Sequence, residues 1–107
     1  MAFDAHVVAL KIIEVMREPV VRIRRRDRDL GDQLRRALQS VAANVGEGRR
    51  RVGADRLHLW RIAAGSAAEA ETQIRIAVAW GYLPETEIAA ALELLDREQA
   101  MLWKLTH

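Results

Sequence analysis

Four stretches of the chain repeat apolar residues at alternating spacings of four and three. On an α-helix, which turns once in about 3.6 residues, this spacing keeps the repeated side chains on one face. The repeats are Ala5, Ala9, Ile12, Met16 and Pro19; Leu30, Leu34, Leu38, Val41 and Val45; Trp60, Ala64, Ala67, Glu71, Ile74 and Val78; and Ile88, Leu92, Leu95, Gln99 and Leu102. Four such helices joined by short connections predict an all-α, antiparallel, up-down-up-down four-helix bundle that occupies residues 1–107 as one domain.

The expected limits of the first two helices follow from prolines, glycines and charges. The first helix is predicted over about 5–21, with Pro19 kinking or ending its last turn. Residues 22–28 (RIRRRDR) are expected to form a basic connector. The second helix is predicted to begin near Asp29, a residue suited to a helix N-terminus, and to end at Gly46–Gly48.

Composition supports helices and restricts the class of protein. Only six glycines and two prolines occur, too few for the turns of an all-β fold, and the segment 81–84 (GYLP) is expected to separate the third helix from the fourth. The absence of cysteine excludes a disulfide framework and a thiolate metal site. Asp4 and His6 interrupt any signal-peptide pattern, and no apolar run approaches the ~20 residues needed to cross a bilayer. We therefore expect a cytoplasmic protein with no membrane partner.

The first predicted helix is apolar well beyond one stripe. Its additional apolar residues are Val7, Val8, Leu10, Ile13 and Val15. A helix that is apolar on most sides has to be covered on more than one side. Because a chain of 107 residues supplies little further cover, we expect another subunit against this helix.

The charges are unevenly distributed along the chain. Residues 22–61 contain twelve basic and five acidic residues, a balance of +7, whereas residues 62–107 carry −4 and the whole chain +2. A basic middle third predicts binding to a polyanion such as RNA or DNA. The arginines expected to contact it are Arg22, Arg24, Arg25, Arg26, Arg28, Arg35, Arg49, Arg50, Arg51 and Arg56. The alternative interpretation is an arginine-rich genome composition with solvated helix faces.

Polar residues lie beside the expected contacts of the second and third helices. An unpaired charge is costly to bury, so we expect these residues to form one hydrogen-bonded network that holds the two helices in register. The expected members are Arg36, Asn44, Glu47, Glu69 and Glu71.

The glutamates of this network do not predict a metal or catalytic site. Di-iron carboxylate bundles need a Glu-x-x-His sequence on two helices. None of the three histidines, His6, His58 and His107, has a glutamate three residues before it. We therefore expect no enzymatic activity, no metal and no cofactor, and we expect each histidine to be an ordinary surface or packing residue.

Three segments of the sequence are similar to those of a known protein family. They are QLRRALQSVAANVGEG (33–48), GSAAEAETQI (65–74) and WGYLPETE (80–87), and the pair Ala5-His6 adds a further point of similarity. In this order they resemble the four-helix-bundle family encoded in bacterial 23S rRNA intervening sequences. Ala42 stands where family members usually carry proline, so the second helix is expected to be straighter.

The resemblance implies a homopentamer of bundles. It also implies kinship with the accessory variability protein of diversity-generating retroelements, a pentamer that binds a reverse transcriptase and its template RNA. Two functions remain open. One is a non-enzymatic RNA-binding or reverse-transcriptase accessory protein whose arginine clusters contact phosphates. The other is a purely structural or protein-interaction oligomer whose arginines offset the acidic last two helices of its neighbours.

Overall fold

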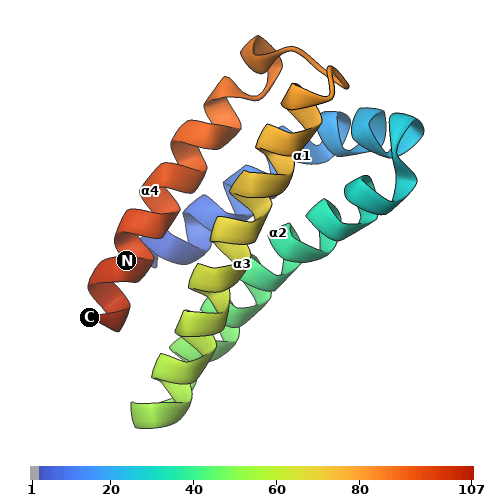
Figure 1. Ribbon diagram of the computed structural model, residues 1–107. Helices are drawn as coiled ribbons and strands as arrows, with labels where there is room; N and C mark the ends of the chain where they lie inside the picture. The colour runs from blue at the N-terminus through green and yellow to red at the C-terminus, as the bar shows by residue number, and fades with distance from the viewer. Residues whose placement is uncertain (1–2) are drawn as a thin grey trace.

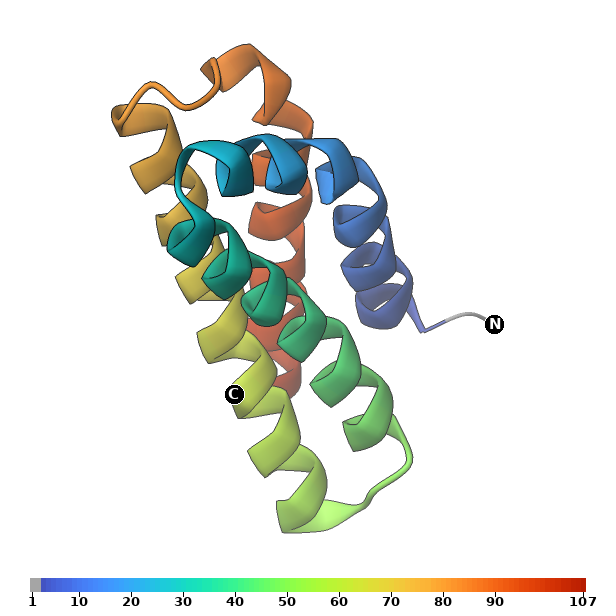
Figure 2. The ribbon, with the colours of Figure 1, turned by 90° about the vertical axis from the view of Figure 1, so that its right-hand side faces the viewer.

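The computed structural model describes residues 3–107, which form four long α-helices and one short 3-10 helix without any strand. They are α1 (Asp4–Arg26), α2 (Arg28–Arg49), α3 (Gly53–Ala79), η1 (Glu85–Glu87) and α4 (Ala89–Thr106). Each of α1 and α3 packs against both α2 and α4, so the four helices stand at the corners of a square. Figures 1 and 2 show consecutive helices running in opposite directions, which confirms the predicted antiparallel bundle.

Helix α1 is longer than predicted, and it is bent. Pro19 lies inside it and has no N–H, so the carbonyl of Val15 loses its usual helical partner. Figure 2 shows the last turns of α1, in lighter blue, crossing the end of the bundle at a steep angle to its first turns. The expected connector at 22–28 was therefore wrong. Residues 22–26 are helical, because Ile23 is completely buried and holds this turn against the core.

Asp27 is the single residue between α1 and α2, and it caps α2 in place of the predicted Asp29. One carboxylate oxygen accepts a hydrogen bond from the Leu30 N–H at 3.0 Å, while the Asp27 N–H donates to the Ile23 carbonyl at 2.7 Å. The other carboxylate oxygen accepts a hydrogen bond from the Tyr82 hydroxyl at 3.2 Å. Asp27 therefore ties the α1–α2 turn to the segment that follows α3.

The glycines near the end of α2 allow close packing and do not end the helix, which continues to Arg49. A Cβ at Gly46 would lie 2.9 Å from Cε1 of His6, and a Cβ at Gly48 would lie 2.6 Å from the indole of Trp60. The predicted end of the second helix at Gly46–Gly48 was therefore too early.

Small and aliphatic side chains make most of the core. Every residue predicted for the buried faces of the first two helices is buried. On α3 the predicted Trp60, Ala67 and Ile74 are buried, and the other fully buried positions are Ala63, Ala70 and Ala77, each one residue before a predicted position. The predicted Ala64, Glu71 and Val78 are only half-buried, as are Leu92 and Gln99 of α4. Within residues 3–107, no helix is both long enough and apolar enough to span a lipid bilayer.

Replacement of Gly31 by alanine should destabilise the bundle by about 1–3 kcal/mol. The added Cβ would lie 2.7 Å from Cα of Arg24 and would push the end of α1 away from the start of α2. The matched control is Gly65→Ala, which adds a methyl group in open space inside α3 and should stabilise the protein by up to about 1 kcal/mol. Urea unfolding measures both free energies. A Gly31→Ala protein as stable as the parent would contradict the close approach of α1 and α2.

Candidate nucleic-acid interface

Nine of the ten arginines predicted to contact nucleic acid lie in two groups at the two ends of α2. The α1–α2 arginines are Arg22, Arg24, Arg25, Arg26 and Arg28; the α2–α3 arginines are Arg49, Arg50, Arg51 and Arg56. Arg35 lies between the groups, exposed on α2. Because α2 has 22 residues and rises ~1.5 Å per residue, the groups are ~33 Å apart, at opposite ends of the bundle.

Acidic residues neutralise part of the α1–α2 group. Arg22 forms an ion pair with Glu87 of η1, which lies 65 residues later in the chain. Arg24 donates through Nε to Oδ1 of Asp32 at 2.7 Å. The balance counted along residues 22–61 therefore overstates the positive charge of this end, because the fold brings η1 beside it.

Two members of this group, Arg25 and Arg28, are exposed and form no ion pair within residues 3–107. Arg26 is also exposed, with its guanidinium carbon 5.4 Å from the centre of the Tyr82 ring, where a cation and an aromatic face attract each other. Arg25, Arg26 and Arg28 are therefore the guanidinium groups of this end that a phosphate can reach, and Arg25 and Arg28 can do so without leaving an aromatic ring.

At the other end, the Arg56 side chain caps the C-terminus of α2. Its Nε and Nη2 donate to the carbonyls of Gly48 and Arg49 at 3.1 and 2.9 Å, which are among the last carbonyls of α2 and lack an i+4 helical partner. The same guanidinium lies 5.2 Å from the centre of the Trp60 ring. Arg56 was predicted to contact nucleic acid, but its donors bind the protein's own backbone.

Arg49 and Arg50 line a surface hollow of about 600 Å³ at this end. His6 from the start of α1 and Glu47 of α2 also line it, and Glu47 is paired with Arg51 at 2.8 Å. Neither Arg49 nor Arg50 forms an ion pair with the described part of the chain. Because arginine binds phosphate oxygens through paired, charge-assisted hydrogen bonds, the hollow is chemically suited to a phosphate group.

The predicted polar network does not form as one unit. Arg36 is exposed and makes no side-chain hydrogen bond within residues 3–107, because the helical period carries it to the outer surface of α2. Glu47 accepts hydrogen bonds from Arg51, just beyond the end of α2, and has none to α3 within residues 3–107.

Asn44 donates to the hydroxyl of Ser40 at 3.1 Å, and that hydroxyl lies 2.7 Å from the hydroxyl of Ser66 on α3. This contact joins α2 to α3, and so does Gln73 of α3, which donates to Gln33 of α2 at 3.5 Å.

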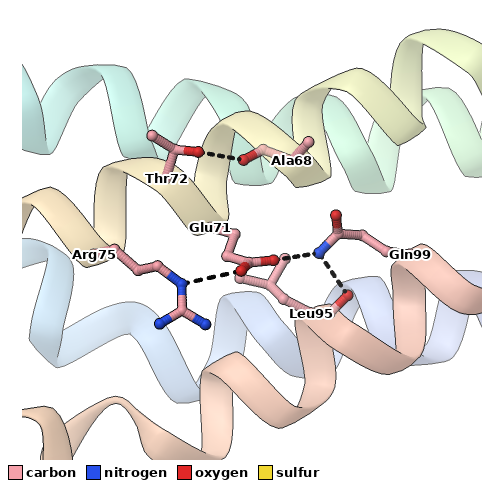
Figure 3. A network of polar contacts seen from close by, with 6 residues as sticks. All are labelled: Ala68, Glu71, Thr72, Arg75, Leu95 and Gln99. Atoms are coloured by element: carbon pink, nitrogen blue, oxygen red, sulfur yellow. Dashed lines mark hydrogen bonds and ion pairs between the residues drawn. The ribbon is translucent and has the colours of Figure 1, made fainter.

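Glu69 and Glu71 take part in separate contacts. Glu69 is exposed and accepts a hydrogen bond from Gln73 at 3.1 Å. Glu71 faces α4, where it accepts hydrogen bonds from Gln99 at 2.7 Å and from Arg75 of its own helix at 3.0 Å (Figure 3). The bond from Gln99, and after it the bond from Arg75, lowers the pKa of Glu71. Glu71 therefore fastens α3 to α4, whereas the sequence analysis assigned it to the contact between α2 and α3.

One buried carboxyl group in the core was missed by the sequence analysis. Glu98 of α4 is 0% exposed, and neither of its carboxyl oxygens has a hydrogen-bond partner in the described chain. Burial raises the pKa of Glu98 to about 8, so the group is mainly protonated at neutral pH. Its place three residues after Leu95 and four before Leu102 would have indicated burial, because both leucines were predicted to face the core.

Replacement of Glu98 by leucine should raise the free energy of unfolding by about 1–3 kcal/mol at pH 5, because it removes a buried polar group that has no partner within residues 3–107, and by more at pH 8. The pKa of Glu98 is about 8 in the folded protein, against the 4.5 that is usual for a glutamate carboxyl group in water. At a pH between these two pKa values, unfolding therefore releases a proton. The parent should therefore lose stability as the pH rises from about 5 to 8, and the advantage of the variant should shrink toward about pH 5.

Urea unfolding at the two pH values tests this expectation. The control Glu18→Gln removes an exposed carboxylate charge of α1 without adding apolar surface and should change stability by about 0.5 kcal/mol or less at both. A Glu98→Leu advantage that does not change with pH would contradict a protonated carboxyl in the folded protein.

Histidines and carboxylates do not gather within residues 3–107 in any group of three that could hold a metal ion. His58 is exposed near the start of α3, and His107 stacks on Trp103 with ring centres 3.4 Å apart. His6 packs against α2 at Gly46.

The sequence from residue 3 to residue 104 matches the family model of the 23S rRNA-intervening sequence protein. A comparison with curated proteins gives no match to this chain. The matched range covers α1, α2 and α3 and nearly all of α4, so it includes every helix of the bundle. The chain belongs to the 23S rRNA-intervening sequence protein family.

Proposed function

We propose that this protein is a non-enzymatic oligomer of helical bundles that binds the phosphate backbone of RNA. The observation that carries the proposal is the hollow at the α2–α3 end, where Arg49 and Arg50 are exposed and form no ion pair within residues 3–107. Arg25 and Arg28 offer a second such pair at the other end of α2. The family takes its name from intervening sequences of 23S rRNA, and for this reason we choose RNA among the polyanions.

Guanidinium groups arranged in this way are suited to phosphates rather than to base edges. Contacts to phosphate fix the position of a protein on a nucleic acid but carry no sequence information. Each contact also releases counterions, so affinity falls as salt rises. We therefore expect RNA binding that is independent of base sequence and strongly dependent on salt.

Replacement of Arg25, Arg28, Arg49 and Arg50 by alanine should weaken RNA binding. If each of the four contacts one phosphate, the slope of log affinity against log salt should fall by about 3, because one contact accounts for ~0.7–0.9. Fluorescence anisotropy with a labelled RNA, repeated over a salt series, measures the slope. Equal isotherms for the parent and this variant at matched low salt would reject the proposed contacts.

The matched control removes four positive charges from other exposed positions. In it, alanine replaces Arg36, Arg61, Arg97 and Lys104. This variant has the same net charge as the first, and its salt slope should stay close to that of the parent. An equal loss of RNA affinity in the two variants would show that RNA binding depends on net charge alone.

The alternative is an oligomer that binds no nucleic acid. The ion pairs Arg22–Glu87 and Arg24–Asp32 favour it, because they show that arginines of this chain find acidic partners within the fold. In that case the salt titration would have no RNA affinity to measure.

Assembly is proposed from the outer face of α1. Val7, Leu10 and Val21 are 48%, 45% and 44% exposed. Val7 and Leu10 share one face of the first turns of α1, and Val21 lies beyond the bend at Pro19. Burying apolar surface of this kind contributes ~25 cal/mol per Å² removed from water. The homopentamer implied by the resemblance is the form that we propose.

Light scattering at micromolar concentration should give a mass of about 60 kDa, which is five times the 12.1 kDa of one chain. Replacement of Val7, Leu10 and Val21 by serine should lower this mass, because it removes the apolar surface that a neighbour would cover. A parent that scatters as a 12.1 kDa monomer would reject the oligomer, while RNA binding is judged separately by the arginine variants.

A further inference from the structure

Two grooves of opposite charge lie on opposite sides of the bundle. The basic groove lies between α1 and α2, and its lining includes three arginines and no acidic residue. Arg24 is paired with Asp32, so Arg17 and Arg35 supply a charge of +2 that is unpaired within residues 3–107. The acidic groove lies between α3 and α4, and its lining includes four acidic residues and one arginine, a charge of −3. Because α1 and α2 form one edge of the square of helices and α3 and α4 form the opposite edge, one bundle carries both grooves at once.

The basic groove joins an apolar floor to a charged rim. Its volume is about 440 Å³, and its floor includes Ile13, Val20 and Leu38. Val21, at its edge, is one of the exposed apolar residues of α1 on which assembly was proposed. The groove therefore continues a surface that gains stability when another molecule covers it.

Charges in both grooves lack partners within residues 3–107. Arg17 and Arg35 in the basic groove form no ion pair there, and neither do Glu85, Glu93 and Asp96 in the acidic groove. Opposite charges on two surfaces steer the surfaces together and fix their register, whereas like charges facing each other cost several kcal/mol.

We infer that the basic groove of one copy receives the acidic groove of a second copy, with Glu93 and Asp96 facing Arg17 and Arg35. This inference rests on the proposed oligomer and names the two surfaces that build it. Such a contact joins two different surfaces of the same chain, so its repetition closes a ring if the rotation between neighbouring copies closes, and builds an open filament if it does not. A ring with an odd number of subunits needs a contact of this kind, because a self-complementary contact joins subunits only in pairs.

In such a contact, some arginines of the chain would bind the neighbouring subunit and others would stay free to bind RNA. Arg24 and Arg35, which the sequence analysis assigned to nucleic acid, line the basic groove and would be covered by the neighbouring subunit. The α2–α3 arginines lie outside both grooves and stay open to RNA.

Charge reversal in each groove tests this contact. The first variant carries Arg17→Glu and Arg35→Glu, and the second carries Glu93→Arg and Asp96→Arg. In the absence of RNA, light scattering of each should show a mass that falls toward the 12.1 kDa of one chain, because the altered groove repels the intact groove of the next copy. A third variant with all four substitutions should regain the parent's mass, because its two grooves attract each other again.

The control variant carries Arg36→Glu and Arg61→Glu, which reverse two exposed arginines outside both grooves, and it should keep the parent's mass. Recovery in the third variant also shows that the substituted chains fold. If the parent is an oligomer and the first two variants keep its mass, or the third fails to regain it, or the control loses it, the docking of these grooves is overturned and the oligomer stands. A monomeric parent overturns both the docking of the grooves and the oligomer. The RNA isotherms then decide whether the protein binds RNA.

Discussion

The close approach of helices through alanine and glycine is the packing on which the rest of this bundle depends. The chain has only five aromatic residues, and α3 meets its neighbours through fully buried alanines. Small side chains at helix contacts let helix axes come close together, so every larger or polar group nearby has to fit the space that remains. Gly46 and Gly48 make room for His6 and Trp60 in this way. Glu98 is enclosed by the same packing, which leaves its carboxyl group without a partner and protonated near neutral pH.

The single-residue turn at Asp27 has consequences for charge as well as for shape. Its carboxylate caps α2 and accepts a hydrogen bond from Tyr82, so the start of α2 is fastened to the segment that leads into η1. This arrangement brings Glu87 to Arg22, although 65 residues separate them in the chain. The charge of a stretch of sequence is therefore not the charge of a surface. The α1–α2 end is partly neutralised, whereas Arg49 and Arg50 at the other end form no ion pair within residues 3–107.

The proposals assign different parts of the bundle to different partners. RNA phosphates are assigned to the ends of α2, where exposed guanidinium groups lie without ion pairs within residues 3–107. Neighbouring subunits are assigned to the sides, where the basic and acidic grooves face in opposite directions. An assembly built through its sides leaves its ends open, so the two kinds of contact are compatible in one molecule.

The sequence by itself determined the four helices, the antiparallel bundle and the buried faces of α1 and α2, because periodicity along a helix is a local property. The three matching segments also identified the family. On α3 almost every face is small or apolar, so the pattern of residues could not decide which face turns inward. Packing against α2 and α4 chose Ala63 over the predicted Ala64.

The tertiary structure alone decided where α1 ends and which polar groups meet. Burial of Ile23 extends α1 through the predicted connector, and it depends on contacts that lie outside the local sequence. Glu71 pairs with Gln99, and Arg36 stays in solvent, because the rotation of each helix about its own axis sets these partners. The rotation of each helix is set by the packing of all four helices together. The period of one helix shows which residues share a face, but only the neighbouring helices settle where that face points.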